Sequence, residues 1–150
     1  MVYKEIPISV QEFMDEITKK CGKEHARWAE NFQAGFANTL LTTVKRHEDG
    51  TTFLLTGDIP AMWLRDSTAQ VRPYLSIVKE DDDLADMIVG LVRKQFFYIS
   101  LDPYANAFNE FENGAGHQAD ETEMSDWIWE RKFEIDSLCY PVQLAYLLYN

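Results

Sequence analysis

The chain has 150 residues, of which 46% are apolar, a size and composition typical of one globular domain with a real core. Its formal net charge of −11 repels phosphate backbones, which argues against nucleic acid as a partner. No apolar run reaches the length of a membrane span, and the N-terminus lacks the features of a signal peptide. We therefore expect a cytoplasmic protein with no membrane partner.

The first third of the chain predicts two helices and a strand. Residues 9–12 (Ser-Val-Gln-Glu) fit a capping box, so a helix is expected to begin with Ser9 as its N-cap and to end near Gly22. A longer helix is expected over residues 24–46. Apolar residues recur there every four positions, at Trp28, Phe32, Phe36, Leu40 and Val44. The β-branched and apolar residues 51–55 predict a short strand.

Two further helices are predicted in the middle of the chain. Ser67 is a candidate N-cap for a helix that runs through Val78 and is disturbed by Pro73. The acidic residues 81–83 open the next helix, which is expected to end at residues 102–103 (Asp-Pro). The buried side of this helix is expected to consist of Leu84, Ile88, Leu91, Val92, Phe96 and Ile99.

A long polar and aromatic segment, residues 104–134, precedes a last helix over residues 135–150. A loop of this length in a compact domain indicates function or disorder, and its aromatic residues argue against disorder. The last helix stops on apolar residues without a stop signal, so we expect the sequence to be cut within a helix. Long helices joined by large loops predict helical hairpins stacked in a ring or bundle. A small helical bundle used for protein contacts is the alternative.

Residues 56–67 combine side chains that suit a sugar-binding site. Asp58 and Asp66 can accept hydrogen bonds from hydroxyl groups. The planar guanidinium of Arg65 can donate several hydrogen bonds at once. The ring of Trp63 can cover the apolar face of a pyranose. The same residues also allow a purely structural interpretation, in which Trp63 lies in the core, Asp66 or Ser67 caps a helix, and Arg65 and Asp66 form a surface ion pair.

A second group of candidate residues lies between positions 106 and 136. This segment is rich in carboxylates, and glycosidases use two carboxyl groups, although most exposed acids are only solvated. Trp129, Glu130 and the acids at 134 and 136 are the stronger candidates, because they flank apolar positions. His117, beside glycines, is a candidate sugar contact, although a lone loop histidine is more often incidental.

The sequence lacks the motifs of nucleotide-binding proteins, serine hydrolases and metal sites. The sequence contains neither of the glycine-rich nucleotide-binding patterns and no nucleophile elbow of a serine hydrolase. Its three histidines and two cysteines show no metal-ligand spacing. We therefore expect no cofactor and no metal.

Two long motifs resemble glycoside hydrolase family 125. They are residues 49–75 (DGTTFLLTGDIPAMWLRDSTAQVRPYL) and residues 127–141 (WIWERKFEIDSLCYP), and they occur in the order found in that family. The resemblance covers nearly the whole chain and is strongest from about Phe32 onward. It implies an inverting exo-α-1,6-mannosidase that releases terminal mannose from N-glycan-type oligosaccharides without a metal. It also implies an (α/α)6 barrel with a sugar-binding crater.

The resemblance also implies roles for individual residues. Arg65 and Asp66 would contact hydroxyls of the terminal (−1) mannose, and Trp63 and Asp58 would shape or support that subsite. The remaining candidates, His117, Trp129, Glu130 and Asp136, would line the same crater.

The chain is short for a complete barrel of this kind. Twelve helices of about 11–12 residues with connections of about 4–6 need roughly 200 residues at least, and about five helices are predicted here. The expected fold is therefore all-α with minor β, an incomplete (α/α)6 barrel in which residues 1–150 form the N-terminal part of one catalytic domain. The catalytic acid and base are expected beyond residue 150, with Asp136 as a candidate within the chain.

The expected function is that of a glycosidase acting on an α-mannoside oligosaccharide, with the isolated chain inactive because it lacks the acid and base. Two alternatives stay open. One is a non-catalytic helical module that binds sugar or protein, and the other is a related α-glucosidase. The sequence does not indicate an oligomeric state.

Overall fold

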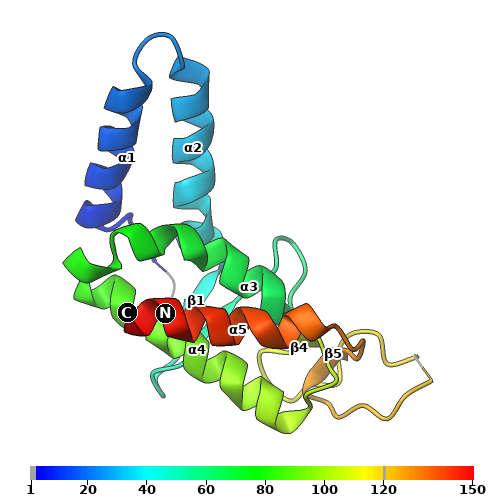
Figure 1. The fold of residues 1–150 in the computed structure, drawn as a ribbon. Coiled ribbons are helices and arrows are strands. Elements are labelled where there is room, and N and C mark those ends of the chain that lie inside the picture. Colours follow the sequence, from blue (N-terminus) through cyan, green and yellow to red (C-terminus); the bar gives the residue numbers. More distant parts are fainter. Residues whose placement is uncertain (1–2, 120) are drawn as a thin grey trace.

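The structure is a computed structural model that describes residues 3–119 and 121–150. Within them it contains five α-helices joined by turns and short strands (Figure 1). The helices are α1 (Ile8–Cys21), α2 (Ala26–Asn38), α3 (Leu64–Val71), α4 (Asp82–Leu101) and α5 (Ile135–Tyr149). None of the helices in these two ranges is long and apolar enough to cross a bilayer. The expectation of a mostly helical chain with minor β structure is confirmed.

Helices α1 and α2 form a hairpin that projects from the body made by α3, α4 and α5 (Figure 1). Its two helices pack through Phe13 and Phe36, whose ring centroids lie 5.5 Å apart. Helix α1 ends as predicted before Gly22, whose φ of +58° is a conformation that favours glycine. The prediction that Ser9 caps α1 is wrong. The helix begins at Ile8, and the Ser9 hydroxyl donates to the Asp81 carboxylate, far away in the sequence.

The predicted helix over residues 24–46 is wrong at its C-terminal end. Helix α2 stops at Asn38 and is followed by one π-helical turn, η1 (Thr39–Thr43), and by strand β1 (Val44–Arg46). Strand β1 pairs antiparallel with β2 (Thr52–Leu54), which confirms the strand predicted at residues 51–55. Because β2 needs a partner for its backbone groups, and because threonine and valine suit extended backbone, this pairing outweighs the helical period.

The prediction that Ser67 caps the next helix is also wrong. Helix α3 already begins at Leu64, and Ser67 lies buried inside it. Its hydroxyl donates to the Leu64 carbonyl at 3.1 Å and accepts from the Gln95 amide at 2.9 Å. The helix ends at Val71, and Pro73 lies in the following 3₁₀ turn, η2 (Arg72–Ser76). A second short 3₁₀ turn, η3 (Val78–Glu80), leads to α4.

Helix α4 agrees with its prediction at both ends. The Asp81 carboxylate caps it by accepting from the Leu84 amide at 2.9 Å, and the helix stops before Asp102. Of the predicted buried residues, Leu84, Ile88 and Leu91 are fully buried, and Val92 and Ile99 are half-buried. The exception is Phe96, which is 43% exposed; Tyr98 is buried instead.

A three-stranded antiparallel sheet joins distant parts of the chain. Its order is β3 (Met62–Trp63), β4 (Ala107–Phe108) and β5 (Ile128–Glu130), with β4 in the middle. The segment predicted as a long loop, residues 104–134, therefore contains two strands. Helix α5 begins immediately after this segment and packs beside α3 and α4 (Figure 1). The two stretches that carry the candidate residues thus meet at one end of the body.

A tight contact between α4 and the β1–β2 hairpin provides a first test of the fold. A Cβ atom at Gly90 would lie 2.6 Å from Thr52 Oγ1 and 2.8 Å from the Gly50 carbonyl. We expect Gly90→Ala to lower the free energy of unfolding by about 1–3 kcal/mol through overpacking, measured by urea denaturation. In the matched control Gly35→Ala, no described atom lies within 4 Å of the added Cβ. That variant should gain up to about 1 kcal/mol of helix propensity. Equal stabilities of the two variants would contradict the described packing.

Candidate functional site

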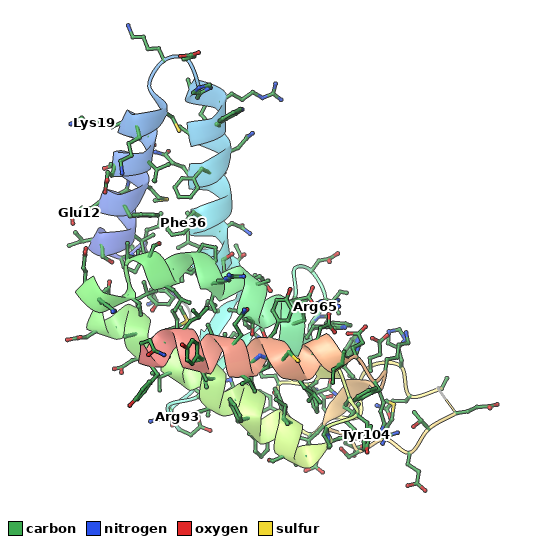
Figure 2. All side chains as sticks on the ribbon, in the orientation of Figure 1. Glu12, Lys19, Phe36, Arg65, Arg93 and Tyr104 are labelled. Atoms are coloured by element: carbon green, nitrogen blue, oxygen red, sulfur yellow. The ribbon has the colours of Figure 1, made fainter. Side chains whose placement is uncertain are left out.

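Arg65 holds together the two stretches that carry the candidate residues. It lies in the first turn of α3, near the start of α5 (Figure 2). Its Nη1 atom donates to Asp136 Oδ2 at 3.0 Å and lies 3.6 Å from Glu134 Oε2. Its Nε atom lies 3.6 Å from Asp66 Oδ2. The four side chains, hereafter the Arg65 cluster, are between 33% and 43% exposed, so a ligand can reach them.

The Arg65 cluster has an excess of carboxylates. Three carboxyl groups surround one guanidinium, so the cluster offers more acceptors than its own donors use. The hydrogen bond from Arg65 holds the pKa of Asp136 below its ordinary value. An ionised Asp136 accepts hydrogen bonds or a proton but has none to donate at neutral pH. As a catalytic candidate it therefore suits a base better than an acid, and that role stays a prediction.

The β3–β4–β5 sheet sets the position of the cluster relative to the second stretch. Trp63 pairs with Ala107, and Ala107 pairs with Glu130, so these three side chains lie on the same face of the sheet. The carbonyl of Asn106 accepts from the Leu64 amide at 3.1 Å and thereby holds the first turn of α3. Trp63 is half-buried at the junction, and its amide donates to Thr56 Oγ1 at 3.1 Å.

Glu130 is a buried acid surrounded by hydrogen-bond donors. Its Oε2 accepts from the Asn106 amide at 2.7 Å, and its Oε1 accepts from the Lys132 ammonium at 2.7 Å. His117 Nε2 lies 3.9 Å from the same Oε1 atom. Burial alone would raise the pKa of Glu130, but the hydrogen bonds from Lys132 and Asn106 outweigh it and lower the pKa. Glu130 is therefore ionised at neutral pH, with its oxygens already occupied.

His117 and Trp129 form the outer wall of this region. The His117 amide donates to the Trp129 carbonyl at 2.8 Å, and the two rings meet edge to face at 6.4 Å. The loop approaches β5 closely, because a Cβ at Gly116 would lie 2.4 Å from the Trp129 carbonyl oxygen. The Trp129 indole Nε1 is buried and has no hydrogen-bond partner among the described residues. The two rings therefore contact each other, and His117 also lies beside Glu130.

Asp58 is not part of the Arg65 cluster as its contacts define it. It is exposed in the turn that is closed by the bridge between Thr56 and Ile59. This turn and α3 border a shallow hollow of about 460 Å³, lined by Thr56, Gly57, Asp66, Ala69 and Gln70. The structural interpretation of Asp66 and Ser67 as helix caps is wrong, because α3 has no side-chain cap and both residues lie inside the helix.

The structure brings most of the predicted residues to one end of the molecule. Arg65, Asp66 and Asp136 are in one cluster; Glu130, His117 and Trp129 form a second group, connected to the first through Trp63 and the sheet. Their roles in binding stay predictions. Sequence reasoning missed Asn106, a buried polar residue between two alanines. Its contact with Glu130 depends on the pairing of β4 with β5, which no motif in the sequence indicates.

The hydrogen bonds of Glu130 imply a specific pH behaviour. The pKa of Glu130 in the folded state is lower than its ordinary value of 4.5. Ionised Glu130 therefore stabilises the fold at pH values above 4.5, and this contribution is lost as the pH falls through the folded-state pKa. We expect Lys132→Met to remove one donor and move the pKa of Glu130 upward, measured by carbon-13 NMR of the carboxyl group. Lys23→Met, at an exposed lysine in the α1–α2 turn, is the control. A Glu130 titration unaffected by Lys132→Met would contradict the described pairing.

A family model described as metal-independent alpha-mannosidase (GH125) matches residues 25–150. The chain belongs to glycoside hydrolase family 125. The matched region contains the Arg65 cluster, the sheet and Glu130, whereas α1 precedes it. Within the described residues, no group of three or more potential ligands could hold a metal ion.

One solved structure and one curated protein are similar to this chain. A metal-independent α-mannosidase from Streptococcus pneumoniae, solved in a non-productive complex with α-1,6-mannobiose, is 53% identical with a TM-score of 0.93. The match covers 99% of this chain and 34% of that chain. The meiotically up-regulated gene 157 protein of Schizosaccharomyces pombe is 32% identical over 150 residues, which are 92% of this chain and 29% of that protein. The chain thus spans about a third of the length of these relatives.

Proposed function

We propose that this chain forms the substrate-holding, N-terminal part of a GH125 catalytic domain that releases terminal mannose from α-1,6-linked oligosaccharides. The observation that carries the proposal is the Arg65 cluster, which unites the two family motifs around one exposed group of charges. The pneumococcal relative, solved with α-1,6-mannobiose, supports the choice of substrate.

The chemistry of the cluster suits the end unit of a glycan. Sugar hydroxyls donate to ionised carboxylates and accept from a guanidinium, and the cluster presents both at its surface. Glu130 is less suited to direct contact, because Asn106 and Lys132 already bind both of its oxygens. We assign it the task of fixing β5, and with it the rings of Trp129 and His117, beside the sugar.

The proposed reaction is a single displacement with inversion at the anomeric carbon. A carboxylic acid protonates the glycosidic oxygen as the bond from that oxygen to the anomeric carbon breaks. A carboxylate on the other face takes a proton from the attacking water, whose oxygen forms the new bond. The two groups stand about 6.5–9.5 Å apart. Glu130 and Asp136, whose pKa values are lowered, do not suit the role of the acid. We place the acid in the part of the catalytic domain that this chain does not span.

The surface of α5 supports the proposal that these residues belong to a larger helical barrel. The helix buries Ser137, Pro141 and Leu144 and leaves a second apolar stripe exposed. The stripe consists of Ile135, Val142, Tyr146 and Tyr149, each at least 55% exposed. A helix that is apolar on two sides is typical of one packed between neighbours.

Proton NMR of α-1,6-mannobiose hydrolysis by the full-length protein tests the proposal. We expect β-mannose as the first product, and activity that survives a chelator. An initial α-mannose product would contradict inversion. Preferential cleavage of an α-glucoside would assign the site to a related glucosidase. Calorimetric binding of mannose without any hydrolysis would assign it to a sugar-binding module.

A further inference from the structure

We propose that Gln95 is a positioning residue for the candidate site: its amide holds the first turn of α3 and thereby keeps Arg65 in place for the substrate. This inference rests on the proposed function and deepens it, because it names the group that fixes a binding residue. Gln95 lies on α4 and is fully buried, so it acts through Arg65 and not by touching a ligand.

The first turn of α3 has a buried side and an exposed side. Leu64, Ser67 and Thr68 share the buried side, and none of them is more than 1% exposed. Arg65 lies between them in the sequence, and its side chain is 39% exposed. The guanidinium therefore begins from a backbone whose position is set on the opposite, buried side of the helix.

The amide of Gln95 contacts all three residues of the buried side. Its Nε2 atom lies 2.9 Å from Ser67 Oγ, 2.9 Å from Thr68 Oγ1 and 3.3 Å from the Leu64 carbonyl oxygen. The hydroxyls of Ser67 and Thr68 in turn donate to the same carbonyl, at 3.1 and 3.2 Å. That carbonyl belongs to the peptide group that joins Leu64 to Arg65. The network therefore fixes the backbone directly before the guanidinium side chain.

Packing alone does not explain a glutamine at position 95. Its Oε1 atom is buried and has no hydrogen-bond donor among the residues that the structure describes. An unpaired buried acceptor costs free energy, and a methionine of similar shape fills the same space without that cost. The amide is therefore better explained by its hold on α3 than by its contribution to the core.

Kinetics of Gln95→Met in the full-length enzyme, alone and combined with Arg65→Ala, test the proposal. Without the amide the first turn of α3 shifts, and a shift of about 1 Å can cost about 100-fold in rate. We expect a smaller loss, about 10-fold in kcat/KM for α-1,6-mannobiose, which appears as a higher KM with kcat little changed because substrate binding weakens. In the Arg65→Ala background the same substitution should cost less than about 2-fold, since Gln95 acts through Arg65.

Asp136 provides a readout that does not depend on catalysis. Its hydrogen bond from Arg65, at 3.0 Å, lowers its pKa. Displacement of Arg65 by Gln95→Met should therefore raise the pKa of Asp136 toward its ordinary value, measured by carbon-13 NMR of the carboxyl group. Gln33→Met is the matched control, because Gln33 donates to Thr18 Oγ1 at 2.7 Å within the α1–α2 hairpin. It should leave both the kinetics and the titration of Asp136 unchanged.

Thr68→Val and Thr68→Ser repeat the test if Gln95→Met does not fold. Thr68→Val removes one acceptor of the amide and should raise KM, whereas Thr68→Ser keeps the hydroxyl and should not; equal KM values overturn the proposal. It is also overturned if the losses caused by Gln95→Met and Arg65→Ala multiply. A lower melting temperature of Gln95→Met, with wild-type KM and an unchanged pKa of Asp136, overturns it too, because Gln95 is then only structural.

A wild-type enzyme that fails to cleave mannobiose contradicts the proposed function instead. In that case the titration of Asp136 decides the role of Gln95. A raised pKa of Asp136 in Gln95→Met supports the positioning of Arg65, and an unchanged pKa overturns it.

Discussion

Replacing Arg65 by alanine should lower kcat/KM for α-1,6-mannobiose about 100-fold in the full-length enzyme, with little loss of stability. The guanidinium donates charge-assisted hydrogen bonds, each worth about 1.5–3 kcal/mol where it meets a substrate oxygen. Its removal also leaves the carboxylates of Asp66, Glu134 and Asp136 close together without their shared cation. Because the cluster is more than a third exposed at Arg65, the effect on folding should stay below about 1 kcal/mol.

Steady-state kinetics and thermal unfolding of the same preparations separate these two effects. Arg65→Lys should restore activity only in part, because an ammonium lacks the planar fork of donors. Arg27→Ala, at an exposed arginine on α2, is the matched control and should behave as the wild type. If Arg65→Ala keeps wild-type kcat/KM, Arg65 does not hold the substrate.

Replacing Asn106 by alanine should lower the free energy of unfolding by about 2–4 kcal/mol and weaken activity as well. The side chain is 1% exposed and makes two hydrogen bonds, one to Glu130 Oε2 at 2.7 Å and one from the Lys132 amide at 3.0 Å. Alanine would leave a buried carboxylate oxygen without its donor, which costs more than the loss of an ordinary hydrogen bond. The β3–β4–β5 sheet, and with it the start of α3, would lose a central support.

Urea denaturation measures the loss, and kinetics below the unfolding transition measure its effect on the site. Asn31→Ala, at an exposed position of α2, should change stability by less than about 0.5 kcal/mol. Asn106→Asp keeps the shape but places a second carboxyl group against Glu130. It should therefore be at least as unstable at neutral pH and recover as the medium becomes acidic. A stable and active Asn106→Ala variant would contradict the support role.

The parts of the fold that were predicted correctly depend on local signals. Helix α4 has an acidic cap, an apolar period and a proline stop, and all three act within a few residues of the helix itself. The incorrect predictions come from long-range partners. Ser9 has the sequence context of a cap, but its hydroxyl binds Asp81. The end of α2 continues a helical period, but Val44 pairs with Leu54 in a strand.

The candidate site shows the same contrast between local sequence signals and long-range contacts. Residue types and motif resemblance identified Arg65, Asp66, Glu130 and Asp136 as candidates, because charged and aromatic side chains around a turn are visible in the sequence. The ion pair between Arg65 and Asp136, at a separation of 71 residues, depends on how α3 and α5 pack. The support by Asn106 likewise depends on the register of β4 and β5. Sequence patterns contain no direct record of either.

The small β3–β4–β5 sheet at one end of the body determines when binding ability arises during folding. Its strands are only two or three residues long and come from three separated parts of the chain, so none of them is stable alone. The α1–α2 hairpin, by contrast, is built from neighbours in the sequence and has low contact order. A synthetic peptide with either motif alone would therefore have no affinity for mannose. Amide exchange should show the sheet protected only by cooperative, whole-body opening, while the hairpin opens independently.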